Sequence, residues 1–140
     1  MNVRSFLDTN IIVYAFGQGL PEKARIAQQL ITEAATERQA VISYQVVQEF
    51  INAVLYGFRV AMSTLDLESF VLTALFPMMA VSSSRALLLQ ALRLQAAHDL
   101  AWHDSLIVAA ALESDCRILY SEDLQDGRRF GDVVVKNPFV

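Results

Sequence analysis

Short apolar segments alternate with segments of helical periodicity along this chain, and this alternation constrains its fold most. The sequence predicts helices at 21–38, 44–58, 66–76, 84–98 and 102–114. It predicts strands at 3–7, 40–43, 78–81, 117–120 and 133–136. Strands that are separated by helices form a parallel sheet with helices on both faces. We therefore expect an α/β fold with a central parallel sheet of about four to five strands.

Proline and serine mark several expected helix ends. Pro21 suits the first turn of a helix, Pro77 is expected to stop another, and the serines at 82–84 can cap a third. Residues 11–16 are ambiguous, with a helical turn as one interpretation. The segment 106–112 is apolar on all sides, which predicts a buried helix.

The composition predicts one compact domain over residues 1–140. No linker or repeat divides the 140 residues, and 54% of them are hydrophobic against 19% charged. This apolar excess predicts a homodimer, with apolar faces at 24–34 and 46–58. The net charge of −4 excludes a strongly basic nucleic-acid-binding surface overall. A single cysteine, Cys116, and the lack of an evident signal peptide or apolar span predict a cytoplasmic protein without a membrane segment.

Four acidic residues fall where the expected topology brings distant segments together. Asp8 follows the first strand, and Glu49 lies in the second turn of the helix after the second strand. Asp104 opens the helix that precedes the fourth strand, and Asp123 follows that strand. Ligands of parallel α/β sheets bind at the carboxyl ends of the strands. We therefore expect these four carboxylates to meet at one edge of the sheet.

Each acid also has a purely structural interpretation. Asp8 could cap the turn that follows it, and Glu49 could belong to a solvated helix face beside Gln45, Gln48 and Asn52. Asp104 could favour a helix N-terminus through the helix dipole. Asp123 and Asp126 could be turn residues.

The joint placement predicts a divalent cation. Two carboxylates about 4.5 Å apart repel by about 4 kcal/mol at an effective dielectric constant near 20. No lysine or arginine lies within six residues of Glu49 or Asp104 to offset this repulsion. Oxygen ligands suit Mg²⁺ or Mn²⁺. Zinc is not expected, because His98 and His103 have no second pair of ligands, although His103 could reach the rim of the site.

Other common catalytic motifs are missing from the sequence. It contains no GxxxxGK[ST] or GxGxxG phosphate-binding loop and no GxSxG nucleophile elbow. Cys116 has no evident activating partner. Metal-assisted phosphoryl chemistry remains, in which a bound ion polarises a phosphate and activates water.

These residues carry a family resemblance. The segments that carry it are Leu7-Asp8-Thr9-Asn10, Glu49 within 43–49, His103-Asp104, and Ser121-Glu122-Asp123 after 118–120. In order and spacing they resemble the PIN-domain nucleases, and among these the small VapC-type toxins of bacterial toxin–antitoxin modules. The resemblance covers nearly the whole chain.

The resemblance implies a Mg²⁺- or Mn²⁺-dependent endoribonuclease that forms a homodimer and is inhibited by a small antitoxin protein. It implies that Asp8, Glu49, Asp104 and Asp123 are the catalytic and metal-binding acids. Ser121 and Asn10 match supporting positions of the family. Asp126 competes with Asp123 for the fourth acidic place, so that choice stays open.

An acidic chain that binds RNA needs local positive charge, because phosphate contacts dominate affinity. Arg128 and Arg129 lie near the fourth motif, and Arg4 and Arg59 are candidate residues of the rim. Each of these arginines could equally belong to ordinary solvated surface.

Three other functions stay open. A phospho-acceptor signalling domain is also a small α/β unit, and Lys136 suits its strand-borne lysine, but no aspartate follows the strand at 78–81. A PIN-like fold could serve only for binding, although a site without activity has no need of repelling carboxylates. A PIN-like DNA nuclease could use the same acids, since a metal site does not select for the 2′-hydroxyl.

Overall fold

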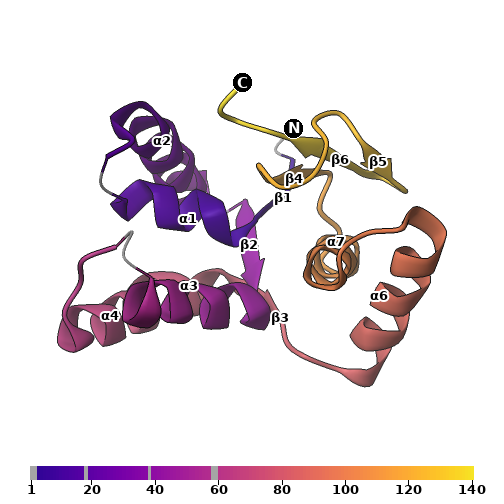
Figure 1. The fold of residues 1–140 in the computed structure, drawn as a ribbon, viewed down its shortest axis with the longest axis horizontal. Coiled ribbons are helices and arrows are strands. Elements are labelled where there is room, and N and C mark those ends of the chain that lie inside the picture. The colour runs from indigo at the N-terminus through magenta and orange to yellow at the C-terminus, as the bar shows by residue number, and fades with distance from the viewer. Residues whose placement is uncertain (1–2, 18, 38, 58–59) are drawn as a thin grey trace.

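A mostly parallel sheet forms the centre of the structure, a computed structural model that describes residues 3–17, 19–37, 39–57 and 60–140 (Figure 1). Within these ranges the sheet has six strands in the order β3-β2-β1-β4-β6-β5. All neighbours pair in parallel except β5, which is antiparallel to β6. The strands are β1 (Ser5–Leu7), β2 (Ala40–Ser43), β3 (Met79–Val81), β4 (Ile118–Tyr120), β5 (Arg129–Phe130) and β6 (Val133–Lys136). The predicted α/β class is confirmed.

Helices cover both faces of this sheet, as expected. The helical segments are α1 (Thr9–Phe16), α2 (Pro21–Glu37), α3 (Tyr44–Tyr56), α4 (Thr64–Phe70), η1 (Val71–Leu75), α5 (Phe76–Met78), α6 (Arg85–His98) and α7 (Trp102–Glu113). Figure 1 shows α1 to α4 on one side of the strands and α6 and α7 on the other. This division follows from right-handed crossovers, because β2 and β3 extend the sheet from one edge of β1 while β4 adds at the other.

The chain order therefore reverses between β1 and β4. Side chains of both strands fill the centre of the core, where Phe6 and Leu119 are fully buried. The helix α7 packs beside them, and its residues 107–111 are all buried. The prediction of a buried helix at 106–112 is thus confirmed in its main part. Ligands of open α/β sheets bind at such a reversal point, outside the carboxyl ends of the strands.

Side-chain caps fix where two of the helices begin. The Ser43 hydroxyl accepts a hydrogen bond from the Val46 N–H at 3.3 Å, which starts α3 directly after β2. The Ser84 hydroxyl accepts one from the Leu87 N–H at 3.1 Å and starts α6. Because these caps set the helix starts, they also set which residues of each helix face the sheet edge.

The expectation that Pro77 stops its helix is wrong. The helix runs on from α4 through η1 into α5, which ends at Met78. The segment η1 is π-helical, and the Phe76 N–H donates to the Val71 carbonyl five residues back. Proline in an α-helix clashes with the carbonyl four residues earlier and lacks an N–H. A wider π turn directly before Pro77 relieves that clash, so the helix continues.

Further boundaries differ from the sequence prediction. The ambiguous residues 11–16 belong to a full helix, α1, and β1 begins at Ser5 rather than Val3. The strand β5 was not predicted, although the Gly131-Asp132 pair between Phe130 and Val133 is typical of a two-residue hairpin turn. Gly131 has a φ of 58°, a conformation that favours glycine. The helix ends predicted at 38 and 58 lie outside the described residues.

No helix in the described ranges is both long enough and apolar enough to cross a membrane.

Candidate active site

The carboxyl ends of β1 and β4 meet at the reversal point and bring two site residues into direct contact. The Asp8 N–H donates to the Tyr120 carbonyl at 3.0 Å, which extends the pairing of the strands by one residue. The Ser121 hydroxyl donates to Oδ2 of Asp8 at 2.7 Å. The two segments therefore converge as predicted, and a hydrogen bond joins their side chains.

Asp8 is a structural cap as well as a site residue. Its Oδ1 accepts a hydrogen bond from the Thr9 N–H at 2.7 Å and so caps α1. The side chain is only 4% exposed. Burial raises the pKa of Asp8 to about 7, and the charges of Asp123 and Glu49 add to the rise, while the bonds from Ser121 and Thr9 oppose it. Burial thus outweighs two hydrogen bonds to the charged form.

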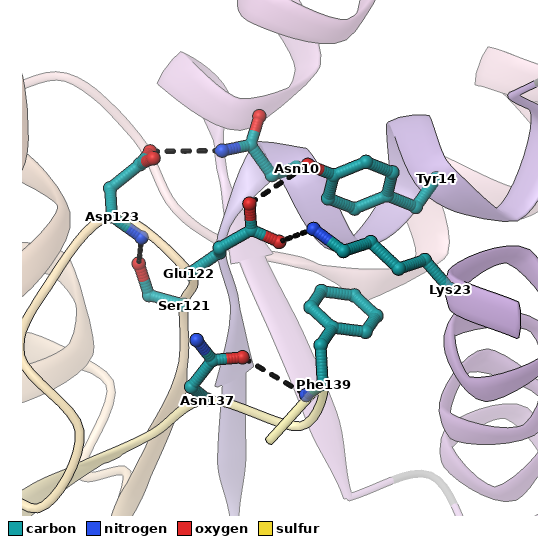
Figure 2. Close-up of polar contacts among 8 residues, drawn as sticks. All are labelled: Asn10, Tyr14, Lys23, Ser121, Glu122, Asp123, Asn137 and Phe139. Atoms are coloured by element: carbon teal, nitrogen blue, oxygen red, sulfur yellow. Dashed lines mark hydrogen bonds and ion pairs between the residues drawn. The ribbon is translucent and has the colours of Figure 1, made fainter. Parts of the chain in front are cut away.

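Asp123 is held at the mouth of the site by two contacts. The Asn10 amide donates to Oδ2 of Asp123 at 3.0 Å, and the Asp123 N–H donates to the Ser121 hydroxyl at 3.2 Å (Figure 2). Ser121 therefore links Asp8 to the backbone of Asp123. Both supporting residues expected from the sequence, Asn10 and Ser121, lie in this network.

The neighbouring acid, Glu122, is bound by residues of α1 and α2. Its Oε1 accepts a hydrogen bond from the Tyr14 hydroxyl at 2.9 Å, and its Oε2 pairs with Lys23 Nζ at 2.8 Å (Figure 2). Lys23 also lies over the Tyr14 ring at 4.8 Å and the Phe139 ring at 5.3 Å. The sequence analysis did not identify Tyr14 or Lys23. Tyr14 lies four residues after Asn10 and therefore on the same face of α1, which was the available signal.

Glu49 and Asp104 complete an open acidic cavity of about 850 Å³. Its lining consists of Asp8, Thr9, Asn10, Val13, Gln45, Gln48, Glu49, Asn52, Ala53, His103, Asp104 and Asp123. All four predicted acids are present, and His103 lies at the rim as considered. Among the described residues, no lysine or arginine contributes to this lining.

The environment of Glu49 and Asp104 favours their protonated forms. Burial raises the pKa of Glu49, with a further rise from Asp104, while Gln45, His103 and Thr9 oppose the shift. Burial and the charge of Asp123 raise the pKa of Asp104, and His103 opposes them. Oε1 of Glu49 and the Thr9 hydroxyl are both buried, and neither makes a hydrogen bond of good geometry. Among the described residues of the lining no lysine or arginine offsets these shifts, and His103 opposes them only in part.

Asp126 lies outside this cavity. Its Oδ1 accepts a hydrogen bond from the Asn137 N–H at 2.8 Å, so the side chain holds the segment after β6. Of the two candidates for the fourth acid, Asp123 therefore lines the cavity, while Asp126 makes a structural contact outside it.

The candidate RNA-binding arginines also lie outside the cavity lining. Arg128 donates to the His98 carbonyl at 3.2 Å and stacks on the Phe130 ring at 4.9 Å, which joins β5 to the end of α6. Arg129 is exposed on β5. The interpretation of Arg4 as a rim residue is wrong, because it precedes β1 and donates to the Ser114 carbonyl at the opposite edge. Arg59 lies outside the described residues.

The donor set fits a hard divalent cation, although the side chains do not converge as they stand. In the part of the chain that the structure describes, no three His, Cys, Asp or Glu side chains lie close enough together to hold a metal ion. The donors are nevertheless carboxylate and amide oxygens, and Oε1 of Glu49 is buried without a partner. Mg²⁺ and Mn²⁺ prefer such ligands and retain several waters.

A family comparison agrees with this arrangement. The sequence profile of the PIN domain matches residues 5–130. The chain belongs to the PIN-domain family. PIN domains are typically metal-dependent nucleases, so membership supports a nuclease and favours it over a phospho-acceptor domain. Among curated proteins, none matches the chain significantly.

The raised pKa of Asp8 predicts how stability of this PIN domain changes with pH. The carboxyl ionises near pH 4 when unfolded and near pH 7 when folded, so between these values the folded state binds more protons. The free energy of unfolding should therefore fall as pH rises through this window, by about 4 kcal/mol at most. Asp8→Asn, whose side-chain oxygen can still cap α1, should flatten this dependence in urea unfolding with EDTA.

Asp126→Asn provides the matched control, because it removes one carboxylate outside the cavity and can keep its bond to Asn137. It should retain the wild-type dependence on pH. An Asp8→Asn protein with the full wild-type slope would contradict the assignment of the shift to Asp8.

Proposed function

We propose that the protein is a metal-dependent endoribonuclease and the toxin of a type II toxin–antitoxin module. The observation that carries the proposal is the acidic cavity, which four carboxylates from four distant segments line, with no lysine or arginine among its described lining residues. Such an arrangement is costly for folding alone, since burial and neighbouring carboxylates raise the pKa values of Asp8, Glu49 and Asp104. Membership of the PIN family would explain why these acids are grouped in spite of their repulsion, because the typical activity of PIN domains needs a bound divalent ion.

In this proposal Asp8, Glu49, Asp104 and Asp123 hold Mg²⁺ or Mn²⁺. When bound, the ion polarises the scissile phosphate and lowers the pKa of a water molecule. Ser121 fixes Asp8 by its hydrogen bond to Oδ2, and Asn10 fixes Asp123. His103 lies at the rim beside Glu49 and Asp104, where its charge would offset part of theirs.

We further propose that exposed positive charge beyond the cavity contacts RNA phosphates. Arg129 is exposed on β5, and Arg128 lies beside it, although part of its guanidinium is used by the His98 carbonyl.

The alternative function is that of a PIN-like DNA nuclease. The two are separated by comparing cleavage of RNA and DNA single strands of the same sequence.

The protein partners belong to the same proposal. A homodimer is supported by exposed leucines on α6, namely Leu88, Leu89 and Leu92. Within the segments at 24–34 and 46–58 that the sequence suggested, Leu55 is exposed as well. An antitoxin is supported by a separate, largely apolar cavity of about 740 Å³ between α2, α5 and β3, lined in part by Ile31, Pro77 and Met79.

The first test of this function combines metal binding with cleavage. Mn²⁺ at about a hundredfold excess over its Kd should stabilise the wild type by about 2.7 kcal/mol. Asp104→Asn should melt at a higher temperature than wild type in EDTA, gain less from Mn²⁺, and cleave no RNA. Thermal melts and gel assays measure both effects. Asp126→Asn should respond like wild type, and equal metal-induced shifts in Asp104→Asn and wild type would remove Asp104 from the proposed ligands.

The toxin role predicts an effect on living cells. Induced expression without a partner should slow bacterial growth, because uncontrolled RNA cleavage stops translation. Asp8→Asn and Asp104→Asn should relieve the arrest at matched protein levels, since each keeps the shape of the side chain and removes a charged ligand. Arrest that persists in both variants would attribute toxicity to binding or misfolding.

The dimer is testable in solution. Sedimentation at micromolar concentration should give about twice the monomer mass. Leu89→Glu together with Leu92→Glu should yield a monomer, because both leucines lie on the exposed side of α6. Leu65→Glu with Leu72→Glu, on α4 and η1, should leave the dimer intact. A wild type that sediments as a monomer throughout this range would end the dimer proposal.

A further inference from the structure

A second, smaller cavity adjoins the acidic cavity. It measures about 310 Å³, the lower end of the range for ligand pockets, and lies between the start of α3 and the start of α6. We call it the side groove. Gln45, Gln48 and His103 line both cavities, so the two spaces lie side by side.

The lining of the side groove differs in kind from that of the acidic cavity. None of the described residues that line it is an acid, a lysine or an arginine. It offers the Tyr44 ring, the amides of Gln45 and Gln48 and the serines at 82–84, together with the His103 imidazole and the apolar side chains of Val81, Leu87, Leu88 and Leu106. Such a surface offers no lysine or arginine to pair with a phosphate, and apolar side chains make up part of it. It suits an uncharged, flat group that carries hydrogen-bond donors and acceptors at its edge.

The geometry of α3 sets the groove at a fixed offset from the acids. Tyr44 and Gln48 are four residues apart and share one row of the helix, while Gln45 and Glu49 form the adjacent row. Tyr44 precedes Glu49 by five residues, which is about 7.5 Å along the helix axis. Gln45 is tied to α7 by its bond to the His103 carbonyl at 3.2 Å, so the wall between the cavities is held from both sides.

Tyr44 is available for contact. It is the first residue of α3 and is 43% exposed, while the inward side of the same helix is filled by Val46, Val47 and Phe50. An aromatic ring so placed is not part of the core. Aromatic side chains that bind single-stranded nucleic acid stack on bases in this way, and amides bind base edges.

We propose that the side groove binds the unpaired base next to the scissile phosphate, with Tyr44 stacked on that base. The inference rests on the proposed nuclease function of the acidic cavity. It makes the substrate a single-stranded segment, such as a loop, because a base within a duplex is not free to stack on Tyr44. Stacking on Tyr44 does not distinguish ribose from deoxyribose.

The test measures cleavage of a short single-stranded RNA with one cut site in Mn²⁺. Tyr44→Ala should lower kcat/KM roughly tenfold, mainly through KM, because it removes a contact made equally to substrate and transition state. Tyr44→Phe should stay within about twofold of wild type, since its ring still stacks. Tyr56→Ala is the matched control on the same helix, at a tyrosine that is 75% exposed and outside both cavities.

An abasic substrate tests the contact itself. When the base beside the cut is removed, kcat/KM of the wild type should fall about tenfold, as it does in Tyr44→Ala. The kcat/KM of Tyr44→Ala should fall little further on this substrate, because the substitution and the missing base delete the same interaction. Losses that multiply in the combination would overturn the base contact, as would an unchanged kcat/KM in Tyr44→Ala.

The remaining outcomes separate this inference from the function on which it rests. Tyr44→Ala could instead turn the protein monomeric and lower kcat/KM by the same factor on the intact and the abasic RNA. That result would make the groove a contact between copies of the chain and overturn the inference. A wild type that cuts neither RNA nor DNA would overturn the proposed function itself. An active wild type with a Tyr44→Ala variant of equal kcat/KM would overturn the base site alone.

Discussion

The hydrogen bond from the Ser121 hydroxyl to Asp8 joins the two strands at which the sheet reverses its order. Asp8 ends β1, caps α1 with its other carboxylate oxygen, and lines the acidic cavity. One side chain thus sets the strand end, the helix start and the position of the candidate site. Burial raises the pKa of this carboxyl to about 7, even though the hydrogen bond from Ser121 opposes the rise.

Charge is distributed around this contact in a way that keeps the cavity acidic. Glu122 and Asp123 are adjacent in sequence, yet Lys23 and Tyr14 bind the first while the Asn10 amide binds the second. The lysine therefore neutralises the acid outside the cavity. The nearby carboxylate of Asp123 contributes to the raised pKa values of both Asp8 and Asp104. A cation from solution is what this arrangement would stabilise most, because it would offset several repulsions at once.

The sequence predicted the parts of the site that depend only on chain order. Residues after parallel strands share an edge, so Asp8 and the 121–123 segment could be placed together without coordinates. The choice between Asp123 and Asp126 could not be made, because the hairpin of β5 and β6 decides it by turning Asp126 toward Asn137. The continuation of the helix past Pro77 depends on a π turn that leaves no sequence signal. The surface that serves the apolar excess stays a prediction, because composition does not tell which helix faces pack against one another.

Helix α3 shows how one element can serve the core and two cavities without a loop. Its buried side includes Val46, Val47 and Phe50. The next row places Gln45 and Glu49 in the lining of the acidic cavity. A third row places Tyr44 and Gln48 in the lining of the side groove. With about 3.6 residues per turn, these rows keep fixed angles to one another. The Ser43 cap fixes the start of the helix, and the packed row fixes its rotation. The offset between Tyr44 and Glu49 is therefore set by the same packing that stabilises the fold, and a site built on a packed helix is positioned more accurately than one built on loops.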